Sequence, residues 1–156
     1  MALCIIPTPL GPLRICEEAG AICAIVFTTG DLCPPETPLL MEAVRQLTAY
    51  FAGELRVFDL PLHPEGTAFQ LQCWQARQTI PYGETLSYGE QARRIGNSKA
   101  VRAVGGANHR NPISIVVPCH RVIGANGTLT GYGGGMDKKA WLLEHEKLHA
   151  KRDCSH

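Results

Sequence analysis

The stretch SYGEQARRIGNSKAVRAVGGANH, residues 87–109, decides the fold of the C-terminal half of this chain. It opens with Ser87 and Glu90, the spacing of a capping box, in which each side chain satisfies a free backbone amide at a helix start. This helix is expected to end at Gly96, and Ser98 can cap a second helix directly after the turn. Two short helices joined by a tight turn predict a helix-turn-helix, a unit that is used to bind DNA.

The second helix of this pair is expected to run to about His109 and to have one basic, small-residue side. At about 100° per residue, that side carries Lys99, Arg102, Gly106 and His109, while the opposite side is apolar. Each glycine of the Gly105-Gly106 pair costs about 1 kcal/mol in a helix, so another molecule or segment must approach this backbone closely. DNA is one candidate, and ordinary helix packing against glycine is the other.

The rest of the C-terminal half is expected to contain short helices, one buried strand and a glycine-rich loop. In chain order these are a capping box at residues 67–70 that opens a helix to about Thr79, a helix stop at residues 81–83, a strand over residues 113–117 that leads into Pro118, a loop over residues 123–135, and a last helix from Asp137 to about His149.

The N-terminal half is expected to form an antiparallel sheet with one amphipathic helix. Short apolar runs separated by turn residues are typical of antiparallel strands, and they lie at residues 3–6, 13–16 and 22–27. Apolar side chains then recur at helical spacing from Pro38 until Gly53.

A linker is expected near residue 65, after a further extended segment over residues 55–62. Pro61, Pro64 and Gly66 lie close together there, which is typical of a domain boundary. We therefore expect an N-terminal α/β domain over residues 1–65, a second domain with the helix-turn-helix over 66–150 and a tail over 151–156. The predicted fold class is α+β.

Composition and hydropathy narrow the class of protein. The chain has 156 residues, of which 45% are hydrophobic and 19% are charged. These values are typical of a globular protein and exclude a disordered, collagen-like or coiled-coil chain. No apolar run approaches the roughly 20 residues that span a bilayer, and the start MALCIIP lacks the basic segment of a secretory signal. We expect a cytoplasmic protein with no membrane partner.

The seven cysteines do not suggest a metal site or a structural disulfide framework. Their number is odd, and no C-x-x-C pair occurs. The six histidines leave open only a zinc site built from ligands far apart in the sequence, and no ligand spacing supports one. We expect no metal, and we expect most of these cysteines to be small buried side chains.

Charge is distributed unevenly along a chain whose net charge is +1. Residues 1–65 have three arginines against eight acidic residues, whereas residues 91–136 have no acidic residue at all. The basic block of residues 91–136 consists of Arg93, Arg94, Lys99, Arg102, Arg110 and Arg121. A basic block inside a nearly neutral protein favours a local site for a polyanion over a generally charged surface.

The run VVPCHRV, residues 116–122, contains the best candidate for a nucleophile. Cys119 is followed by His120 and Arg121, and positive neighbours stabilise the thiolate, which is the reactive form of cysteine. An isolated Cys-His pair also fits a buried thiol beside a surface histidine. The basic block and a downstream acid–histidine pair, His145-Glu146, favour a reactive cysteine.

The run PCHRVIG, residues 118–124, resembles the active-site signature of the O6-alkylguanine-DNA alkyltransferases, also called methylated-DNA–protein-cysteine methyltransferases. Further similar motifs occur in the family's order. They are FQ at 69–70 with Trp74, IPYGET at 80–85, SY at 87–88, AVGGA at 103–107, NP at 111–112, GYGG at 131–134 and WLLEHE at 141–146; TPLG at 8–11 resembles the family's N-terminal strand turn. The resemblance implies a ribonuclease H-like N-terminal domain followed by a winged helix-turn-helix-like catalytic domain.

The resemblance also implies a reaction and the catalytic residues for it. A thiolate at Cys119 would take the alkyl group directly from O6 of guanine in DNA, with O4 of thymine as a second candidate position. His120 would accept the thiol proton through a bound water, and Glu146 would orient that imidazole. Tyr88 would donate a proton to the departing guanine, and Asn111 would tie the hinge to the cysteine-bearing strand. The thioether is not hydrolysed, so each molecule would act once and without a cofactor.

By the same resemblance, the partner would be double-stranded DNA containing O6-alkylguanine, bound by a monomer that flips the damaged nucleotide out of the helix. Arg102 would fill the vacated stack, and the helix would lie in the minor groove. The remaining expected DNA-binding residues are Lys99, Ala103, Gly106, Ser87, Arg110 and Arg121. The expected base pocket consists of Val122, Tyr132, Gly133 and Gly134.

The sequence departs from the family at residues 108–110, which read NHR where many members have Met-Arg-Gly. The resemblance therefore does not predict how tightly this protein binds DNA or which DNA sequences it prefers around the lesion.

Two other functions fit part of the sequence. An alkyltransferase-like lesion sensor would bind DNA without repairing it, but such proteins lack the cysteine present here as Cys119. A cysteine hydrolase would need an oxyanion hole elsewhere and would leave the helix-turn-helix unexplained.

Overall fold

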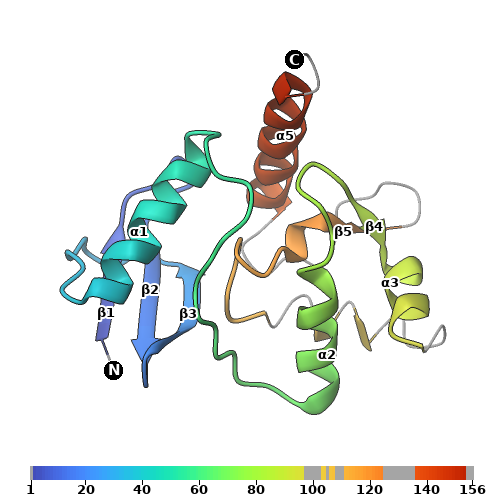
Figure 1. The fold of residues 1–156 in the computed structure, drawn as a ribbon, viewed down its shortest axis with the longest axis horizontal. Helices are drawn as coiled ribbons and strands as arrows, with labels where there is room; N and C mark the ends of the chain where they lie inside the picture. Colours follow the sequence, from blue (N-terminus) through green and yellow to red (C-terminus); the bar gives the residue numbers. More distant parts are fainter. Residues whose placement is uncertain (1, 97–102, 105, 108–110, 125–135, 154–156) are drawn as a thin grey trace. The chain divides into compact units, whose positions relative to one another are not determined.

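The computed structural model describes residues 2–96, 103–104, 106–107, 111–124 and 136–153 of the chain (Figure 1). The chain divides into two compact units, Met1–Glu65 and Gly66–His156, and each is treated by itself below.

The N-terminal unit is built on a three-stranded antiparallel sheet in the order β1-β2-β3. Its strands are β1 (Ala2–Ile6), β2 (Leu13–Glu18) and β3 (Ala21–Phe27), which confirms the three strands predicted from the sequence. The β2–β3 turn places Ala19 and Gly20 at φ values of 53° and 79°. These are left-handed conformations, which glycine adopts without steric cost.

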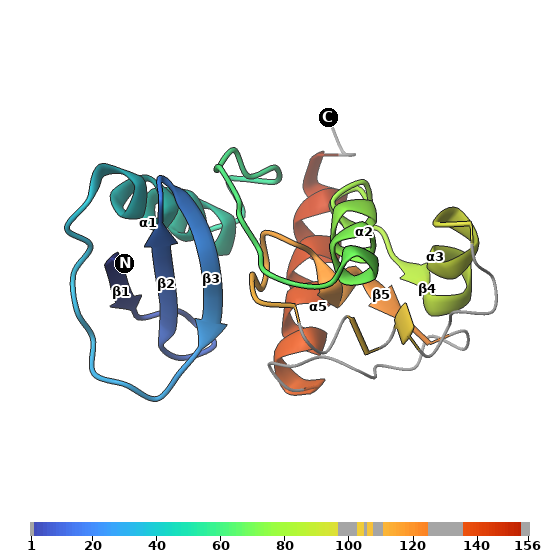
Figure 2. The same ribbon diagram turned by 90° about the horizontal axis from the view of Figure 1, so that it is seen from below.

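Helix α1 (Pro38–Phe51) covers the sheet and contacts β1 and β2 (Figure 2). It begins where the Thr37 hydroxyl accepts a 3.1 Å hydrogen bond from the Leu40 amide, and Pro38 occupies the first turn, where no amide is needed. The buried apolar residues of the helix are Leu40, Ala43, Leu47 and Tyr50. Their burial against the sheet forms the core of this unit.

The extended segment predicted over residues 55–62 is not a strand. Among the described residues it forms one isolated bridge, in which the Ile22 amide donates to Pro61 and the His63 amide donates to Ile22. The buried Gln46 side chain pairs with the backbone of Asp59, as a neighbouring strand would. It donates to the Asp59 carbonyl at 3.0 Å and accepts from the Asp59 amide at 2.9 Å. A side chain thus satisfies backbone groups that a ladder would otherwise pair.

The C-terminal unit contains the two predicted capping boxes. Thr67 and Gln70 cap helix α2 (Ala68–Arg77), and Ser87 and Glu90 cap helix α3 (Tyr88–Arg94). Both side-chain bonds of each box are present, so the first turns of these helices are fixed as the sequence predicted.

A short parallel pair joins the start of α3 to the cysteine-containing segment. Strand β4 (Leu86–Ser87) pairs with β5 (Val122–Ile123), with Leu86 opposite Val122. The 3₁₀ turn η1 (Cys119–Arg121) precedes β5 directly, and helix α5 (Met136–Asp153) contacts η1. Helix α5 is longer than expected, because residues 151–153, predicted in the tail, are helical.

The second helix of the predicted helix-turn-helix lies mostly outside the described residues. Gly96 ends the first helix with φ +81°, as the turn requires. Residues 103–104 and 106–107 are helical, and Val104 and Ala107 pack in a core with Cys73 and Tyr88. The described apolar residues of this helix are therefore buried, as expected, and the rest of its apolar side lies outside the described residues.

The strand predicted over residues 113–117 is wrong, because this segment forms tight turns. The Val116 amide donates to Ser114 at 2.8 Å, and Ile115 has a φ of +72°. The Asn111 side chain organises the turns, since it accepts from the Ile113 amide at 3.0 Å and donates to the Val117 carbonyl at 3.0 Å. The β-branched run reflects burial of its side chains and not extension of its backbone.

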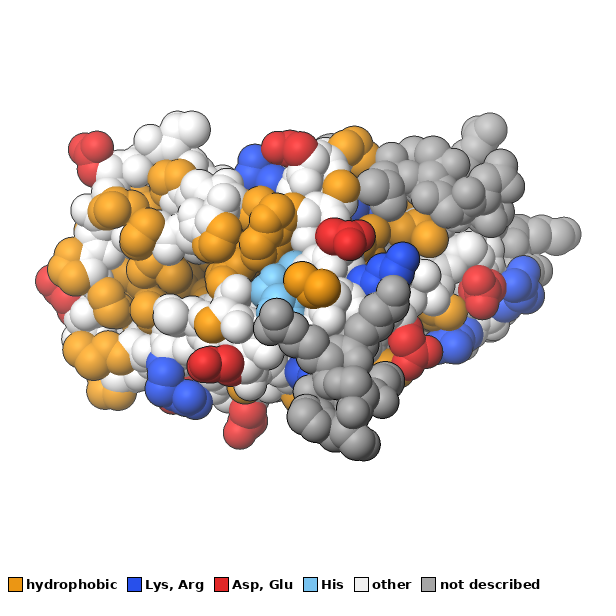
Figure 3. All heavy atoms as spheres, turned by 90° about the horizontal axis from the view of Figure 1, so that it is seen from above, with side chains coloured by type: hydrophobic (Ala, Val, Ile, Leu, Met, Phe, Trp, Pro, Cys, Tyr) orange, Lys and Arg blue, Asp and Glu red, His pale blue; other side chains and the backbone are white. Residues whose placement is uncertain are grey.

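Some large apolar side chains remain exposed within the described parts of both units. In the N-terminal unit they are Leu3, Leu32, Met41 and Val57. Figure 3 shows one face of the molecule, on which hydrophobic side chains are exposed among scattered charged ones. No helix in the described part of the chain is long and apolar enough to cross a membrane.

Candidate active site

Cys119 begins the 3₁₀ turn η1, directly after Pro118, and its side chain is buried. Burial raises the pKa of the Cys119 thiol to about 11, although the positive charges of Arg77 and Lys139 and the amide of Asn111 act in the opposite direction. The thiol is therefore protonated at neutral pH. It needs a base to become a nucleophile.

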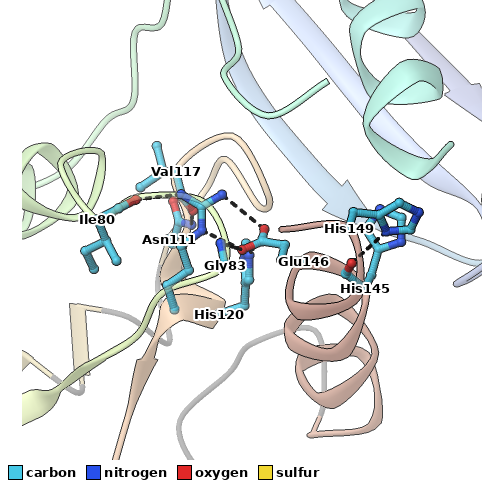
Figure 4. A network of polar contacts seen from close by, with 9 residues as sticks. Ile80, Gly83, Asn111, Val117, His120, His145, Glu146 and His149 are labelled. Carbon is cyan, nitrogen blue, oxygen red and sulfur yellow. Dashed lines mark hydrogen bonds and ion pairs between the residues drawn. The ribbon is translucent and has the colours of Figure 1, made fainter. Parts of the chain in front are cut away.

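His120 and Glu146 form a buried pair beside this thiol. His120 Nε2 lies 2.6 Å from Glu146 Oε2, and the two side chains are 0% and 1% exposed. Figure 4 shows the two groups pointing toward one another, His120 from η1 and Glu146 from α5. Burial alone would raise the pKa of Glu146, but His120 and Arg121 outweigh it and hold the pKa well below its usual range. Glu146 is thus a carboxylate at neutral pH.

The ionised carboxylate fixes the tautomer of His120. A carboxylate can only accept, so whenever the imidazole of His120 is neutral, its Nε2 carries the proton and its Nδ1 carries a lone pair. Within the described part of the chain, Nδ1 is buried and has no hydrogen-bond partner. The imidazole is therefore oriented at one nitrogen by Glu146 and free to accept a proton at the other.

Arg121, which is expected among the DNA-binding residues, belongs to this buried network. Its Nε donates to Glu146 Oε1 at 2.7 Å, its Nη2 donates to Oε2 at 3.1 Å, and its Nη1 donates to the Ile80 carbonyl at 2.7 Å. Arg121 holds the Glu146 carboxylate in place through a two-point contact.

Lys139 is a site residue that the sequence analysis missed. Its ammonium group is fully buried and donates to the Val122 carbonyl at 2.6 Å and to the Tyr88 hydroxyl at 3.4 Å. Burial lowers its pKa. One signal could have pointed to it: Lys139 precedes Glu146 by seven residues, two helical turns, and so lies on the same side of α5.

Among the other expected site residues, some have structural roles, some are exposed, and the rest are not described by the structure. Asn111 bonds the turns that lead to Cys119, as described above, while the Ser87 hydroxyl accepts from the Glu90 amide at 3.1 Å as a helix cap. Ala103 and Gly106 are exposed on their helix. The remaining expected residues lie outside the described part of the chain, namely Lys99, Arg102, Arg110, Tyr132, Gly133 and Gly134.

The C-terminal unit thus contains a buried cysteine, a buried histidine–carboxylate pair and a buried lysine in contact with a tyrosine hydroxyl, residue types that can serve as a nucleophile, a base and a group that orients the base. Nucleophilic catalysis uses these residue types. Among the described residues there is no group of three or more side chains placed to hold a metal ion.

Comparison with known proteins assigns both units to one family. Residues 68–148 match the DNA binding domain of 6-O-methylguanine DNA methyltransferase, and residues 3–64 match its ribonuclease-like domain. The chain belongs to the 6-O-methylguanine DNA methyltransferase family. The matched range 68–148 includes every residue of the site described above.

Individual members of the methyltransferase family are similar over nearly their whole length. The methylated-DNA–protein-cysteine methyltransferase of Methanosarcina acetivorans is 51% identical over 153 residues, which cover 94% of this chain and 98% of the relative. The crystal structure of the Mycobacterium tuberculosis O6-methylguanine methyltransferase has a TM-score of 0.86 at 49% identity and covers 94% of this chain and 93% of its own. A second structure from that organism, OGT in complex with DNA, gives the same TM-score, identity and coverage. The α+β fold class expected from the sequence is therefore confirmed.

Proposed function

We propose that this protein repairs DNA by moving an alkyl group, typically methyl, from O6 of guanine to Sγ of Cys119 in a single irreversible turnover. Family membership supports the reaction class. The observation that carries the proposal to particular residues is the buried His120–Glu146 pair directly beside Cys119, with the unpaired Nδ1 of His120 available to accept a proton.

The first step is activation of the nucleophile. The thiol proton of Cys119 passes through a bound water to Nδ1 of His120. The imidazolium that results is stabilised by the Glu146 carboxylate, which accepts from Nε2. The high pKa of the buried thiol fits this order of events, because the reactive thiolate forms only when the base removes the proton.

The second step is displacement at the alkyl carbon. A bond forms between Sγ of Cys119 and the alkyl carbon, and the bond from that carbon to O6 breaks with its electrons on the guanine. Tyr88 donates its phenolic proton to the departing guanine, which makes guanine a better leaving group. Lys139 holds this hydroxyl and the Val122 carbonyl, and we place that carbonyl at the edge of the base pocket.

Access to O6 requires the nucleotide to leave the DNA stack, because a thiol does not reach this atom within a duplex. Arg102 would fill the vacated position, and the exposed small residues Ala103 and Gly106 would allow their helix to lie close to the minor groove. Lys99 and Arg110 would contact phosphates, and residues 132–134 would complete the base pocket. We place this activity in the cytoplasm, in a monomer, on the sequence-based expectations given above.

The stoichiometry of repair tests this proposal. A duplex with one O6-methylguanine is incubated with increasing protein, and the DNA is digested and its nucleosides are quantified by chromatography. We expect one guanine restored per protein molecule and none with Cys119→Ser. Repair that continues beyond one lesion per molecule, or repair by Cys119→Ser, would contradict the proposal.

A further inference from the structure

Arg77 is a fully buried charge in the C-terminal unit that the reaction steps above do not use. It is the last residue of α2, and its Nη2 donates to the Val104 carbonyl at 3.1 Å. Its Nε and Nη1 are also buried, and neither has a hydrogen-bond partner in the part of the chain that the structure describes. One of its three nitrogens is therefore satisfied, whereas all three nitrogens of Arg121 have acceptors.

An arginine guanidinium stays charged inside a protein, so its burial costs free energy unless a nearby anion compensates the charge. Glu146, the buried carboxylate of this unit, is already engaged with His120 and Arg121. No carboxylate in the described residues pairs with Arg77. Among the described residues, a neighbouring neutral group that loses a proton would compensate the charge of Arg77.

Two thiols are placed to become that anion. Cys73 precedes Arg77 by four residues and lies on the same side of α2. Helix α2 also contacts η1, whose first residue is Cys119. Burial raises the pKa of both thiols, and the charge of Arg77 lowers both. For Cys119, Arg77 is the strongest of the groups that oppose burial, ahead of Asn111 and Lys139.

We propose that Arg77 is the counter-cation of the Cys119 thiolate, a buried charge that makes this cysteine nucleophilic. The inference rests on Cys119 as the alkyl acceptor. When the Cys119 proton leaves for His120, the sulfur gains a negative charge between Arg77 from α2 and Lys139 from α5, and the Arg77 charge is compensated at the same moment. Alkyl transfer then converts the thiolate to a neutral thioether.

Other buried ionisable groups lie in the same unit as Cys119, and a test must separate Arg77 from them. They are Cys73 on α2, Tyr88 on α3, His120 and Arg121 on η1, and Lys139 and Glu146 on α5. Arg77 could also serve only as a tether for the helix that contains Val104. Arg77→Gln keeps a donor for the Val104 carbonyl without the charge, Arg77→Lys keeps the charge, and Arg77→Leu keeps neither.

The experiment measures the rate of Cys119 alkylation by iodoacetamide against pH in the native full-length protein. Adduct is quantified on the Cys119 peptide by mass spectrometry, in a Cys73→Val background that removes the second thiol. Because an opposite charge within about 4 to 6 Å shifts a pKa by about 1 to 3 units, we expect Arg77→Gln to move the midpoint upward by at least about one pH unit. Arg77→Lys should stay close to the parent.

Each alternative has its own outcome. A midpoint that is unchanged in Arg77→Gln, with slower reaction only in Arg77→Leu, would make Arg77 a tether and overturn the proposal. If Arg77→Leu does not fold, Arg77→Gln decides alone. The matched control is Arg45→Gln, which removes an exposed arginine charge from the N-terminal unit and should leave the midpoint in place.

A separate experiment tests the proposed function: the protein without substitutions is incubated with a duplex that contains O6-methylguanine. If DNA methylates Cys119 but Arg77→Gln leaves the iodoacetamide midpoint unchanged, only the role of Arg77 is refuted. A shifted midpoint without methyl transfer from DNA would refute the alkyl-transfer function and leave the counter-cation assignment intact.

Discussion

His120 Nε2 donates to Glu146 Oε2 across 2.6 Å, and neither side chain is accessible to solvent. The two residues are 26 positions apart in the sequence and come from different elements, η1 and α5. Because Arg121 holds the other side of the same carboxylate, the imidazole has one orientation, and its free nitrogen is fixed with it.

This relationship predicts that His120 and Glu146 act as one unit in alkyl transfer. His120→Ala and Glu146→Gln should each slow single-turnover methyl transfer by about 100-fold or more, the usual contribution of a positioned base. The double variant should be scarcely slower than the slower single one, since residues that act together are not additive. Rapid-quench kinetics with a methylated duplex measure all four proteins. Full additivity of the two effects would show that they do not form a relay.

The same carboxylate predicts an acid-sensitive contribution to stability. The pKa of Glu146 is depressed in the folded protein, so its contribution is complete above the unfolded value of about 4.3 and is lost as pH falls toward the folded value. At pH 7, Glu146→Gln should lower the free energy of unfolding by about 3 to 5 kcal/mol, because it leaves Arg121 buried without its partner.

Urea unfolding of the parent and Glu146→Gln at pH 7, 5 and 3.5 measures this effect. The difference between the two proteins should be similar at pH 7 and 5 and smaller at 3.5. A difference that stayed constant down to the lowest pH would show that Glu146 is not selectively stabilised as a carboxylate.

Tyr88 and Lys139 should affect the chemical step and not DNA binding. Tyr88→Phe removes the proposed proton donor, and Lys139→Met removes the ammonium group that contacts it and the Val122 carbonyl. Each change should lower the single-turnover rate by about 10- to 100-fold. The dissociation constant for a methylated duplex, measured by fluorescence anisotropy with Cys119→Ser variants, should change little. A large loss of DNA affinity with an unchanged transfer rate would show that both residues act in DNA binding and not in the chemical step.

Arg102→Ala should separate nucleotide flipping from alkyl transfer. If Arg102 fills the gap left by the flipped nucleotide, its loss should slow repair of a duplex strongly. Reaction with the free base O6-benzylguanine needs no flipping and should proceed at nearly the parent rate. Parallel measurement of both rates is the test. Equal slowing of the two reactions would assign Arg102 to the fold or the pocket.

Lys99→Ala is the matched control for that comparison. As a proposed phosphate contact, Lys99 should affect affinity uniformly across DNA sequences, and its loss should reduce the salt dependence of binding by about one counterion. It should leave the free-base reaction unchanged.

Local signals in the sequence were sufficient for most secondary structure. The capping boxes at Thr67 and Ser87 fixed where α2 and α3 begin, because the caps depend only on residues three positions apart. The turn at Gly96 followed from the same kind of local rule. Motifs predict Cys119, His120 and Glu146 as a catalytic trio, and the structure brings the histidine and the glutamate together.

Features that depend on distant contacts were not predictable. Residues 113–117 were taken for a strand because an apolar β-branched run reports burial, which a turn held by the Asn111 side chain satisfies equally well. Arg121 was counted with the basic block, since its carboxylate partner lies 25 residues away. The burial of Lys139 and Arg77 was missed for the same reason: a charged side chain is ordinarily exposed, and only the fold reveals its partners.

The most direct test of the account is the mass of the protein before and after reaction with a duplex that contains O6-methylguanine, followed by peptide mapping. We expect the intact protein to become heavier by one methyl group, with the adduct on the Cys119 peptide. A methyl group on Cys73 or another cysteine, or restored DNA with no change in the mass of the protein, would contradict it.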